Sequence, residues 1–436
     1  MLLRFALSLA VALTLALPAR AEVAIQDITS PGGIDAWLVE EHAIPFVALE
    51  LRFKGGASLD AAGKRGATSL MVALLEEGAG DMDARAFARA AESLAATFSF
   101  GVNDDSVSVS AKFLTENRDQ AVDLLRDALT RPRFDDDAVE RVRAQVLSNI
   151  RSGLKDPDQI AGDAFAAMLF GDHPYGSNES GTEASVAALT RDDLISAHGA
   201  ALTRDRVFVS AVGDITAAEL GALVDTLLAD LPATGAALPT DVTPAFPGGT
   251  HVTDFETPQS VVLFGQPGVG LEHPDFFALY ILDTVLGGSG LESRLMHEVR
   301  EKRGLTYGVY TFTVDKTHTA YWMGTVASAN DRVAETIAVI RDEWQKLRSE
   351  GITEAELADA KTYLTGAYPL RFDGNGPIAN IMVNMQADDM GIDYIATRND
   401  RVNAVTLEDV NRVAREMLDP DRLTFVVVGR PQGLSN

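Results

Sequence analysis

The sequence has 436 residues, of which 46% are hydrophobic and 23% are charged, and its formal net charge is −26. This length favours two or more globular domains, and the strong negative charge argues against nucleic acid or an anionic membrane surface as a partner. The sequence contains no cysteine, which excludes disulfides, thiolate metal sites, a lipid-anchoring cysteine and cysteine nucleophiles.

The first 21 residues have the pattern of a secretory signal peptide. Arg4 precedes an apolar stretch that ends at Leu17, and Ala19-Arg20-Ala21 is a small-x-small cleavage site. The apolar stretch is shorter than the about 20 residues that a membrane anchor needs. We therefore expect cleavage after Ala21, a periplasmic location, and a mature chain with 35 basic and 63 acidic residues.

Residues 22–230 are expected to form an N-terminal domain. FVALELRF (46–53) and DSVSVSAKF (105–113) are predicted strands, the latter with alternation along its length. Helices are predicted where the segments read as helical, at 66–78, 81–96, 116–130, 136–152 and 193–200. Residues 231–250, LPATGAALPTDVTPAFPGGT, hold four prolines and three glycines without an apolar period, which predicts a linker.

Residues 251–436 are expected to form a C-terminal domain that repeats the first. Thr190, Asp193, Asp205 and Gly213 each have an identical residue 216 positions later. One offset shared by two separate motifs indicates two copies of one domain. The strands predicted here are 260–266 and 318–327, and the helices are 275–286, 289–302, 331–349, 354–367 and 407–417. Strands beside helices with hairpin connections predict α+β domains with mainly antiparallel sheets, and leave the strand order open.

The segment from residue 285, VLGGSGLESRLMHEVREKRGLTYGVYTF, carries the chemistry of the second half. Its glycines free the backbone ahead of the predicted helix 289–302, and Ser289 is a candidate N-cap. Arg300 lies near the end of that helix and Tyr307 lies early in the strand that follows. A reversal of the chain between them would bring the two side chains together.

This segment resembles the signature of the C-terminal domain in the pitrilysin/insulinase family of zinc peptidases, to which the mitochondrial processing peptidase subunits are related. That family has a glycine-rich stretch, a helix ending in R-E-x-x-G-L, and a tyrosine seven residues after the arginine, the spacing of Arg300 and Tyr307. The resemblance implies that this pair reaches toward substrate at a zinc ion held elsewhere. Taken singly, Arg300 could instead form a surface salt bridge with Glu301 or a neighbouring acid, and Tyr307 could be a half-buried strand aromatic. By the same resemblance, the glycine-rich stretch contacts substrate through Gly287, Gly288, Ser289 and Gly290.

Residues 52–78 resemble the segment that holds the inverted zinc motif H-x-x-E-H in this family. Aligning the glycines at 66 and 78 with the family's flanking glycines assigns a different residue to every motif position, and the third zinc ligand falls in the predicted helix 136–152. The positions of the first histidine, the catalytic glutamate, the second histidine and the third ligand hold Ser69, Val72, Ala73 and Asn149. Zinc requires lone-pair donors such as histidine or carboxylate, and water activation requires a base. The sequence therefore predicts that this chain binds no metal.

Other sites have weaker support in the sequence. No two of the seven histidines are four residues apart, and His297 with Glu298 and Glu301 gives H-E-x-x-E, which lacks the second histidine of a zincin. His173 lies in GDHPYGSNESGT, which resembles a turn-forming loop of the family, so we expect it to be structural. The string LGGSG lacks the lysine of a phosphate-binding loop, and no G-x-S-x-G is present.

The resemblance implies that the chain is half of a clamshell-shaped peptide chamber. Its expected partner is a catalytic subunit of the same family that brings H-x-x-E-H and zinc, while peptides are the expected substrates and this chain alone has no activity. After signal cleavage no membrane contact is expected. The alternative is a peptide-binding or scaffold protein without an enzymatic partner.

Overall fold

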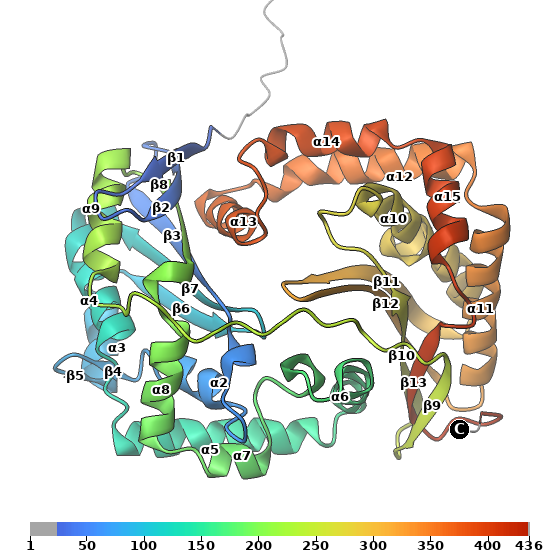
Figure 1. Ribbon diagram of the computed structural model, residues 1–436, viewed down its shortest axis with the longest axis horizontal. Helices are drawn as coiled ribbons and strands as arrows, with labels where there is room; N and C mark the ends of the chain where they lie inside the picture. The colour runs from blue at the N-terminus through green and yellow to red at the C-terminus, as the bar shows by residue number, and fades with distance from the viewer. Residues whose placement is uncertain (1–23, 435–436) are drawn as a thin grey trace, which may run out of the picture.

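The computed structural model describes residues 24–434 of the chain, so the predicted signal peptide lies outside the described residues. The described residues form two similar halves, each with one mainly antiparallel sheet and helices packed against it (Figure 1). This arrangement confirms the predicted α+β fold class. Within residues 24–434, no helix is long and apolar enough to cross a membrane.

The first half contains a six-stranded sheet with the order β1-β2-β8-β3-β7-β6, in which only β2 and β8 pair in parallel. The strands are β1 (Gln26–Thr29), β2 (Asp35–Glu40), β3 (Phe46–Lys54), β6 (Thr97–Val102), β7 (Ser106–Leu114) and β8 (Val207–Gly213). The helices are α2 (Ala67–Val72), α3 (Ala84–Ser93), α4 (Arg118–Thr130), α5 (Asp136–Gly153), α6 (Pro157–Phe170), α7 (Glu183–Ala187), α8 (Arg191–Ala201) and α9 (Ala217–Leu228). A short hairpin joins β4 (Gly78–Ala79) to β5 (Met82–Asp83).

The second half contains a five-stranded sheet with the order β11-β12-β10-β13-β9, in which only β13 and β9 pair in parallel. The strands are β9 (Gly249–Asp254), β10 (Gln259–Pro267), β11 (Thr306–Lys316), β12 (Thr319–Ala329) and β13 (Thr424–Gly429). The helices are α10 (Phe276–Asp283), α11 (Val333–Glu350), α12 (Glu354–Ala367), α13 (Asn375–Ala387), α14 (Tyr394–Ala404) and α15 (Leu407–Met417). Residues 229–248, between the halves, contain no helix or strand.

The repeat predicted from the sequence is present in the structure. Helices α8 and α15 begin 216 residues apart, and a strand with a parallel neighbour, β8 or β13, follows each of them. Both helices begin with the same capping box, since Thr190 and Thr406 accept a hydrogen bond from the backbone N–H of Asp193 and Asp409. Such a cap stabilises a helix by about 1 kcal/mol, which is a physical reason for the matching residues.

One helix of each half packs on the sheet of the other half. Helix α6 lies against β10 and β13, and helix α13 lies against β3 and β8 (Figure 1). The contact of α13 includes two hydrogen bonds to backbone carbonyls, from Ser210 Oγ to Ala379 O at 2.6 Å and from Gln386 Nε2 to Val209 O at 2.8 Å. The two sheets therefore share their cores through exchanged helices.

The hairpin tips of the two sheets also meet. Lys316, at the end of β11, donates to Asp104 Oδ2 at 2.7 Å, and the backbone N–H of Thr317 donates to Asp105 at 3.3 Å. Arg65 holds the other oxygen of Asp104 at 2.7 Å. These contacts join the halves at a second place, in addition to the exchanged helices.

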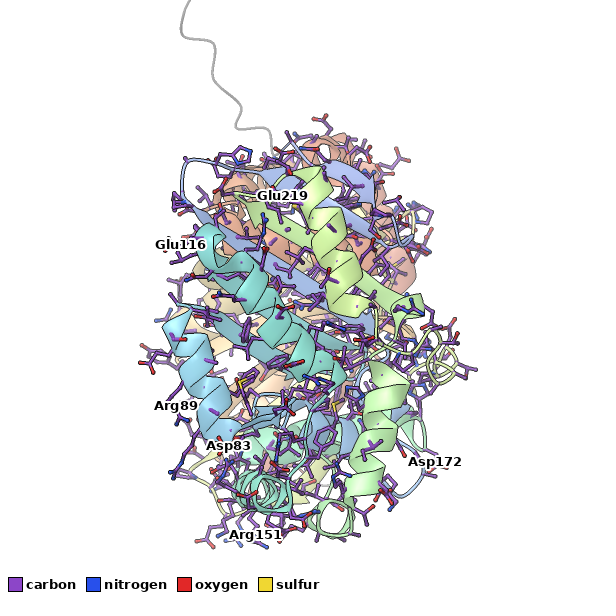
Figure 2. All side chains as sticks on the ribbon, turned by 90° about the vertical axis from the view of Figure 1, so that its left-hand side faces the viewer. Asp83, Arg89, Glu116, Arg151, Asp172 and Glu219 are labelled. Atoms are coloured by element: carbon purple, nitrogen blue, oxygen red, sulfur yellow. The ribbon has the colours of Figure 1, made fainter. Side chains whose placement is uncertain are left out.

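The outer helices carry much of the charge of the first half. Figure 2 shows Asp83 and Arg89 at α3, and Glu219 on α9, at the solvent side of the helices that cover the sheet. The opposite faces of these helices bury apolar side chains such as Phe87 and Val224. This division is typical of a solvated charged surface over an apolar core.

Two predicted helices differ from the structure in conformation as well as in their boundaries. The segment predicted as a helix at 66–78 is helical only in α2, and 3₁₀-type bonds follow, from the N–H of Leu74 to Met71 O and of Leu75 to Val72 O. The helix predicted at 289–302 does not begin at Ser289, whose side chain makes no capping bond. A short 3₁₀ turn comes first, and the segment Met296–Glu301 forms wider π-helical turns.

Candidate functional site

Arg300 lies on the π-helical segment Met296–Glu301 and its guanidinium is free of carboxylates. Within residues 24–434 no acidic group lies within 4.0 Å of it. Glu301, the neighbouring acid that could have formed a surface salt bridge with Arg300, pairs with His297 at 2.9 Å instead. Because π-helical turns are rare and are frequently found at functional sites, both the backbone and the unpaired charge set Arg300 apart from an ordinary surface arginine.

Tyr307 lies at the start of β11 and is 90% exposed. The pairing of β11 with β12 shifts register between Thr306 and Val309, so a bulge surrounds Tyr307. The hydroxyl of Thr306 fixes this bulge, since it interacts with Gly308 N, Gly308 O and Ala327 O. A bulge re-aims the side chains next to it, and this one leaves the tyrosine ring outside the sheet rather than half-buried on it.

Arg300 and Tyr307 lie together, as the reversal of the chain between them would require. The guanidinium carbon is 5.4 Å from the centroid of the Tyr307 ring. At an exposed position such a contact is worth about 0.5–1 kcal/mol. The pair presents guanidinium N–H groups and a phenol O–H that have no acceptor in the described part of the chain, and these donors can hold a peptide carbonyl or a developing oxyanion.

The glycine-rich stretch 287–290 lies beside β11, and each of its three glycines has a structural reason to be glycine. A Cβ on Gly287 would lie 2.5 Å from Thr311 Oγ1, and a Cβ on Gly288 would lie 2.6 Å from Asp283 Oδ2. Gly290 has φ +64° and open space around it, so its backbone conformation favours glycine. Close packing alone therefore explains Gly287 and Gly288, whatever they contact in addition.

Asp283, which the sequence did not single out, is buried beneath this stretch. Trp322 Nε1 donates to Asp283 Oδ1 at 2.6 Å, and the carboxyl is 4% exposed. Burial raises the pKa of Asp283 to about 6. An aspartate inside the apolar run FFALYILDTVL was the only signal for it, since an ionisable group on a buried face requires a reason.

The four positions aligned with the zinc motif lie on α2 and α5, which pack together. Ser69 Oγ donates to the carbonyl of Glu179 at 2.7 Å, and Val72 is buried with 3% exposure. Ala73 is the exposed C-cap residue of α2, and Asn149 accepts a hydrogen bond from Gln145 at 2.9 Å. The side chains of Val72 and Ala73 offer no lone pair, and Ser69 and Asn149 are engaged with protein groups.

No other cluster supplies metal ligands in residues 24–434, where no three His, Cys, Asp or Glu side chains are placed to hold a metal ion. In the H-E-x-x-E string, His297 bonds Glu301, but Glu298 pairs with Lys302 and Arg303. Those two cations hold the pKa of Glu298 at about 2. His173 caps the short turn Pro174–Gly176 and reaches Thr240 O, so it has a structural role.

Family models match most of the chain. Residues 37–183 match the model described as insulinase (peptidase family M16), and residues 188–364 match the model described as the peptidase M16 inactive domain. An uncharacterized zinc protease of Mycobacterium leprae is 31% identical over 399 residues, covering 90% of this chain and 88% of the relative. A Helicobacter pylori protein named non-peptidase homolog YmxG is 25% identical over 390 residues, covering 89% and 90%.

A solved structure agrees with these matches. The crystal structure titled peptidase M16 inactive domain from Pseudomonas fluorescens superposes with a TM-score of 0.87 and 27% identity, covering 95% of this chain and 99% of that one. Fold and site together define a duplicated α+β protein of metallopeptidase architecture. The chain belongs to the insulinase (M16) peptidase family. The matches to an inactive-domain model and to a non-peptidase homolog are consistent with a non-catalytic family member.

Proposed function

We propose that this chain is the non-catalytic subunit of a heterodimeric, periplasmic zinc peptidase. A partner of the same family brings the H-x-x-E-H motif and the zinc ion. This chain supplies half of the peptide chamber, the segment 287–290 as a contact for substrate, and the donors of Arg300 and Tyr307. In the partner's active site, these donors hold the peptide carbonyl and the oxyanion that develops on it.

One observation carries this proposal: an arginine without an acidic partner among residues 24–434 stacks on a tyrosine that is 90% exposed. A guanidinium normally finds a carboxylate on a surface with so many acids, and a large aromatic ring is normally buried at least in part. Neither side chain does so here. Irregular backbone positions both side chains: π-helical turns hold Arg300 and a bulge holds Tyr307. Such irregular backbone favours a role in binding another molecule rather than in stabilising this fold.

The partner is required because the positions aligned with the zinc motif hold no adequate ligand and no base. A serine hydroxyl engaged by a carbonyl, an amide and two aliphatic side chains cannot replace two histidines and two glutamates. Peptide hydrolysis at neutral pH needs an activated water. The isolated chain is therefore expected to bind no stoichiometric zinc and to cleave no peptide.

The test is reconstitution of the mature chain with a catalytic subunit that contains H-x-x-E-H. Metal content and peptide cleavage are measured for each subunit alone and for the mixture, and activity is expected only in the mixture. Arg300→Ala or Tyr307→Phe should then reduce kcat/KM by about 10²–10³ when one oxyanion donor is lost. Zinc in the partner should be unchanged in both variants.

Matched controls separate this effect from general damage. Tyr310→Phe removes a hydroxyl from the same strand at a position that is 45% exposed, and Arg415→Ala removes an exposed arginine of α15. Both controls should retain full activity in the complex. Unchanged rates in Arg300→Ala and Tyr307→Phe would contradict the role given to the pair, and cleavage by the isolated chain would contradict the need for a partner.

The second candidate is a peptide-binding or scaffold protein without an enzymatic partner. The exposed tyrosine and the unpaired arginine would serve a binding site equally well. Purification of the complex from cells distinguishes the two candidates. A stable heterodimer with a chain that carries H-x-x-E-H favours the first, and a homodimer that binds peptide without cleaving it favours the second.

A further inference from the structure

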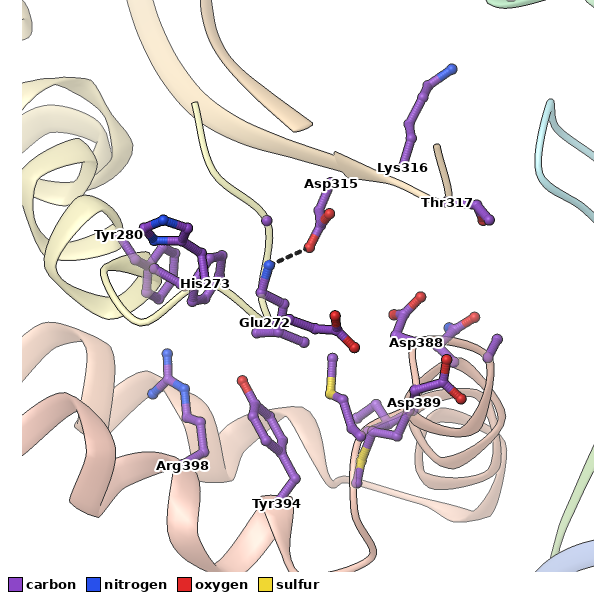
Figure 3. Close-up of a pocket in the computed structure, with 18 of the residues that line it drawn as sticks. Glu272, His273, Tyr280, Asp315, Lys316, Thr317, Asp388, Asp389, Tyr394 and Arg398 are labelled. Carbon is purple, nitrogen blue, oxygen red and sulfur yellow. Dashed lines mark hydrogen bonds between the residues drawn. The ribbon is translucent and has the colours of Figure 1, made fainter. Parts of the chain in front are cut away.

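A large cavity lies where the second half meets the first, away from Arg300 and Tyr307. It has a volume of about 960 Å³. Its walls are the loop 270–275, helix α10, the turn between β11 and β12, and the exchanged helix α13 with α14 (Figure 3). Neither the zinc-motif positions nor the glycine-rich stretch lines it.

Three carboxylates at one end of this cavity have no partner in the part of the chain that the structure describes. Glu272, Asp388 and Asp389 form no side-chain hydrogen bond or ion pair within residues 24–434. Figure 3 shows the carboxylate of Glu272 directed toward Asp388. Like charges placed together without a counter-ion repel one another. A cation bound at this end would therefore be attracted by all three carboxylates.

The cations that line the cavity do not neutralise this end. Lys316 is bonded to Asp104, and in Figure 3 its side chain points away from the cavity. Arg398 lies at the opposite end, where it donates to Leu364 O at 2.8 Å, and Arg371 also lies at that end, near enough to Tyr368 to act on the pKa of its phenol. Lys54 is near enough to Asp388 to lower the pKa of that carboxyl, but it forms no ion pair with it.

The other end of the cavity is aromatic. Arg398 stacks on the rings of Tyr280 and Tyr368, with its guanidinium carbon 5.6 and 4.5 Å from their centroids, and Tyr394 lies beside it (Figure 3). Tyr368 is 8% exposed, yet its hydroxyl has no hydrogen-bond partner within residues 24–434. The phenol lines the cavity, so its hydroxyl can bond water or a ligand there.

We propose that this cavity binds an organic cation, with an ammonium or guanidinium group held by Asp388, Asp389 and Glu272 and an apolar body packed against Tyr280 and Tyr394. Aromatic faces attract such a group as well as its apolar body. The cation is either a free amine or the side chain of a bound peptide. This site is a property of the chain alone and does not depend on the proposed peptidase partner.

The charge of Asp388 gives the site a pH dependence. Burial, together with the neighbouring charges of Asp315, Asp105 and Asp389 and against the opposing effect of Lys54, raises the pKa of Asp388 to about 6. The carboxyl is therefore charged at neutral pH and protonated under mild acid. His273 and Glu272 also line the cavity. Binding of a cation is expected to weaken as the pH falls through the pKa of Asp388.

The test uses the mature full-length chain and calorimetric titration at neutral pH. One probe is phenethylamine, and two others are short peptides that are identical except for a single lysine or norleucine. The variant Asp388→Asn/Asp389→Asn removes two charges from the cavity. Asparagine tolerates the left-handed backbone at position 389, where φ is 53°, so the variant should fold. Asp359→Asn/Asp400→Asn removes the same charge from exposed helix positions outside the cavity.

Binding of phenethylamine, of the lysine peptide, or of both supports the proposal, and the pattern identifies the source of the cation. The affinity should fall on the order of tenfold in Asp388→Asn/Asp389→Asn, because two partly screened ion pairs are lost, and should change less than about twofold in the control. Absence of binding by all three probes would overturn the proposal. Binding of the norleucine peptide as tightly as the lysine peptide, or an equal loss of affinity in the two variants, would overturn it as well.

Discussion

Replacing Phe165 by alanine tests whether the exchanged helices make the two halves one cooperative unit. Phe165 lies on α6, is 3% exposed, and packs on the sheet of the second half, where its Cζ would be 3.1 Å from a Cβ built on Gly265. Its ring also meets Phe246 of the connecting segment edge to face. Truncating a buried phenylalanine costs about 3–5 kcal/mol. We expect a loss of this size in the free energy of unfolding.

The informative comparison is Phe87→Ala, which has the same buried fraction but lies wholly within the first half. Phe87 is 3% exposed on α3 and contacts Phe98 of β6. Urea unfolding is followed by tryptophan fluorescence in a Trp37→Phe background, so that only Trp322 and Trp344 of the second half report. If α6 and α13 couple the halves, both alanine variants should lower the urea midpoint measured by the tryptophan fluorescence of the second half.

A contrary result is easy to recognise. If Phe87→Ala lowers the unfolding midpoint measured by far-ultraviolet circular dichroism but leaves the fluorescence midpoint of the second half in place, the halves unfold independently. The exchanged helices would then be peripheral contacts rather than a shared core. Ile195→Ala, at a position that is 44% exposed, controls for truncation itself and should shift neither midpoint appreciably.

Two other predictions concern the glycine-rich stretch. Burial raises the pKa of Asp283 to about 6, so the folded chain binds the proton of this carboxyl more tightly than the unfolded chain does. The stability that Asp283 contributes therefore falls as the pH rises from about 4 through about 6. At pH values well above 6, Asp283→Asn should therefore raise the free energy of unfolding by up to roughly 3 kcal/mol, and the melting temperature with it. This advantage should disappear near pH 4. A difference in thermal unfolding that does not change with pH would contradict the raised pKa of Asp283. Gly287→Ala should cost about 1–3 kcal/mol because its Cβ meets Thr311 at 2.5 Å, whereas Gly290→Ala has open space and should cost about 1 kcal/mol for its positive φ alone. Equal losses in denaturant unfolding would refute the packing explanation.

The duplication could be predicted from the sequence because its signal is local. The capping boxes at Thr190 and Thr406, and the strands that follow, depend on residues within a few positions of one another. The exchange of α6 and α13 could not be predicted in this way. Their apolar faces look like those of any amphipathic helix, and the choice of sheet depends on side chains such as Ser210 and Gln386 that are far apart in the chain.

The same distinction holds for the sites. Arg300 and Tyr307 are seven residues apart, so a reversal of the chain between them was enough to predict their proximity. The cavity draws its carboxylates from residue 272 and from residues 388 and 389, and no local pattern connects these segments. The helix predicted at 289–302 was wrong in detail because apolar spacing cannot distinguish α-helical from π-helical turns that bury the same residues, here Leu295 and Val299.

The exposure of the Arg300–Tyr307 pair makes its role unusually simple to isolate. A cation–π contact at an exposed site contributes about 0.5–1 kcal/mol, and Tyr307 buries almost none of its surface in the fold. The positions of both residues are set by other groups, since Val299 is buried beside Arg300 and the hydroxyl of Thr306 holds the bulge. Changing either side chain should therefore leave the folded chain nearly as stable as before. A large loss of activity in the complex would then reflect lost contacts with substrate, because these two side chains contribute little to the stability of this subunit.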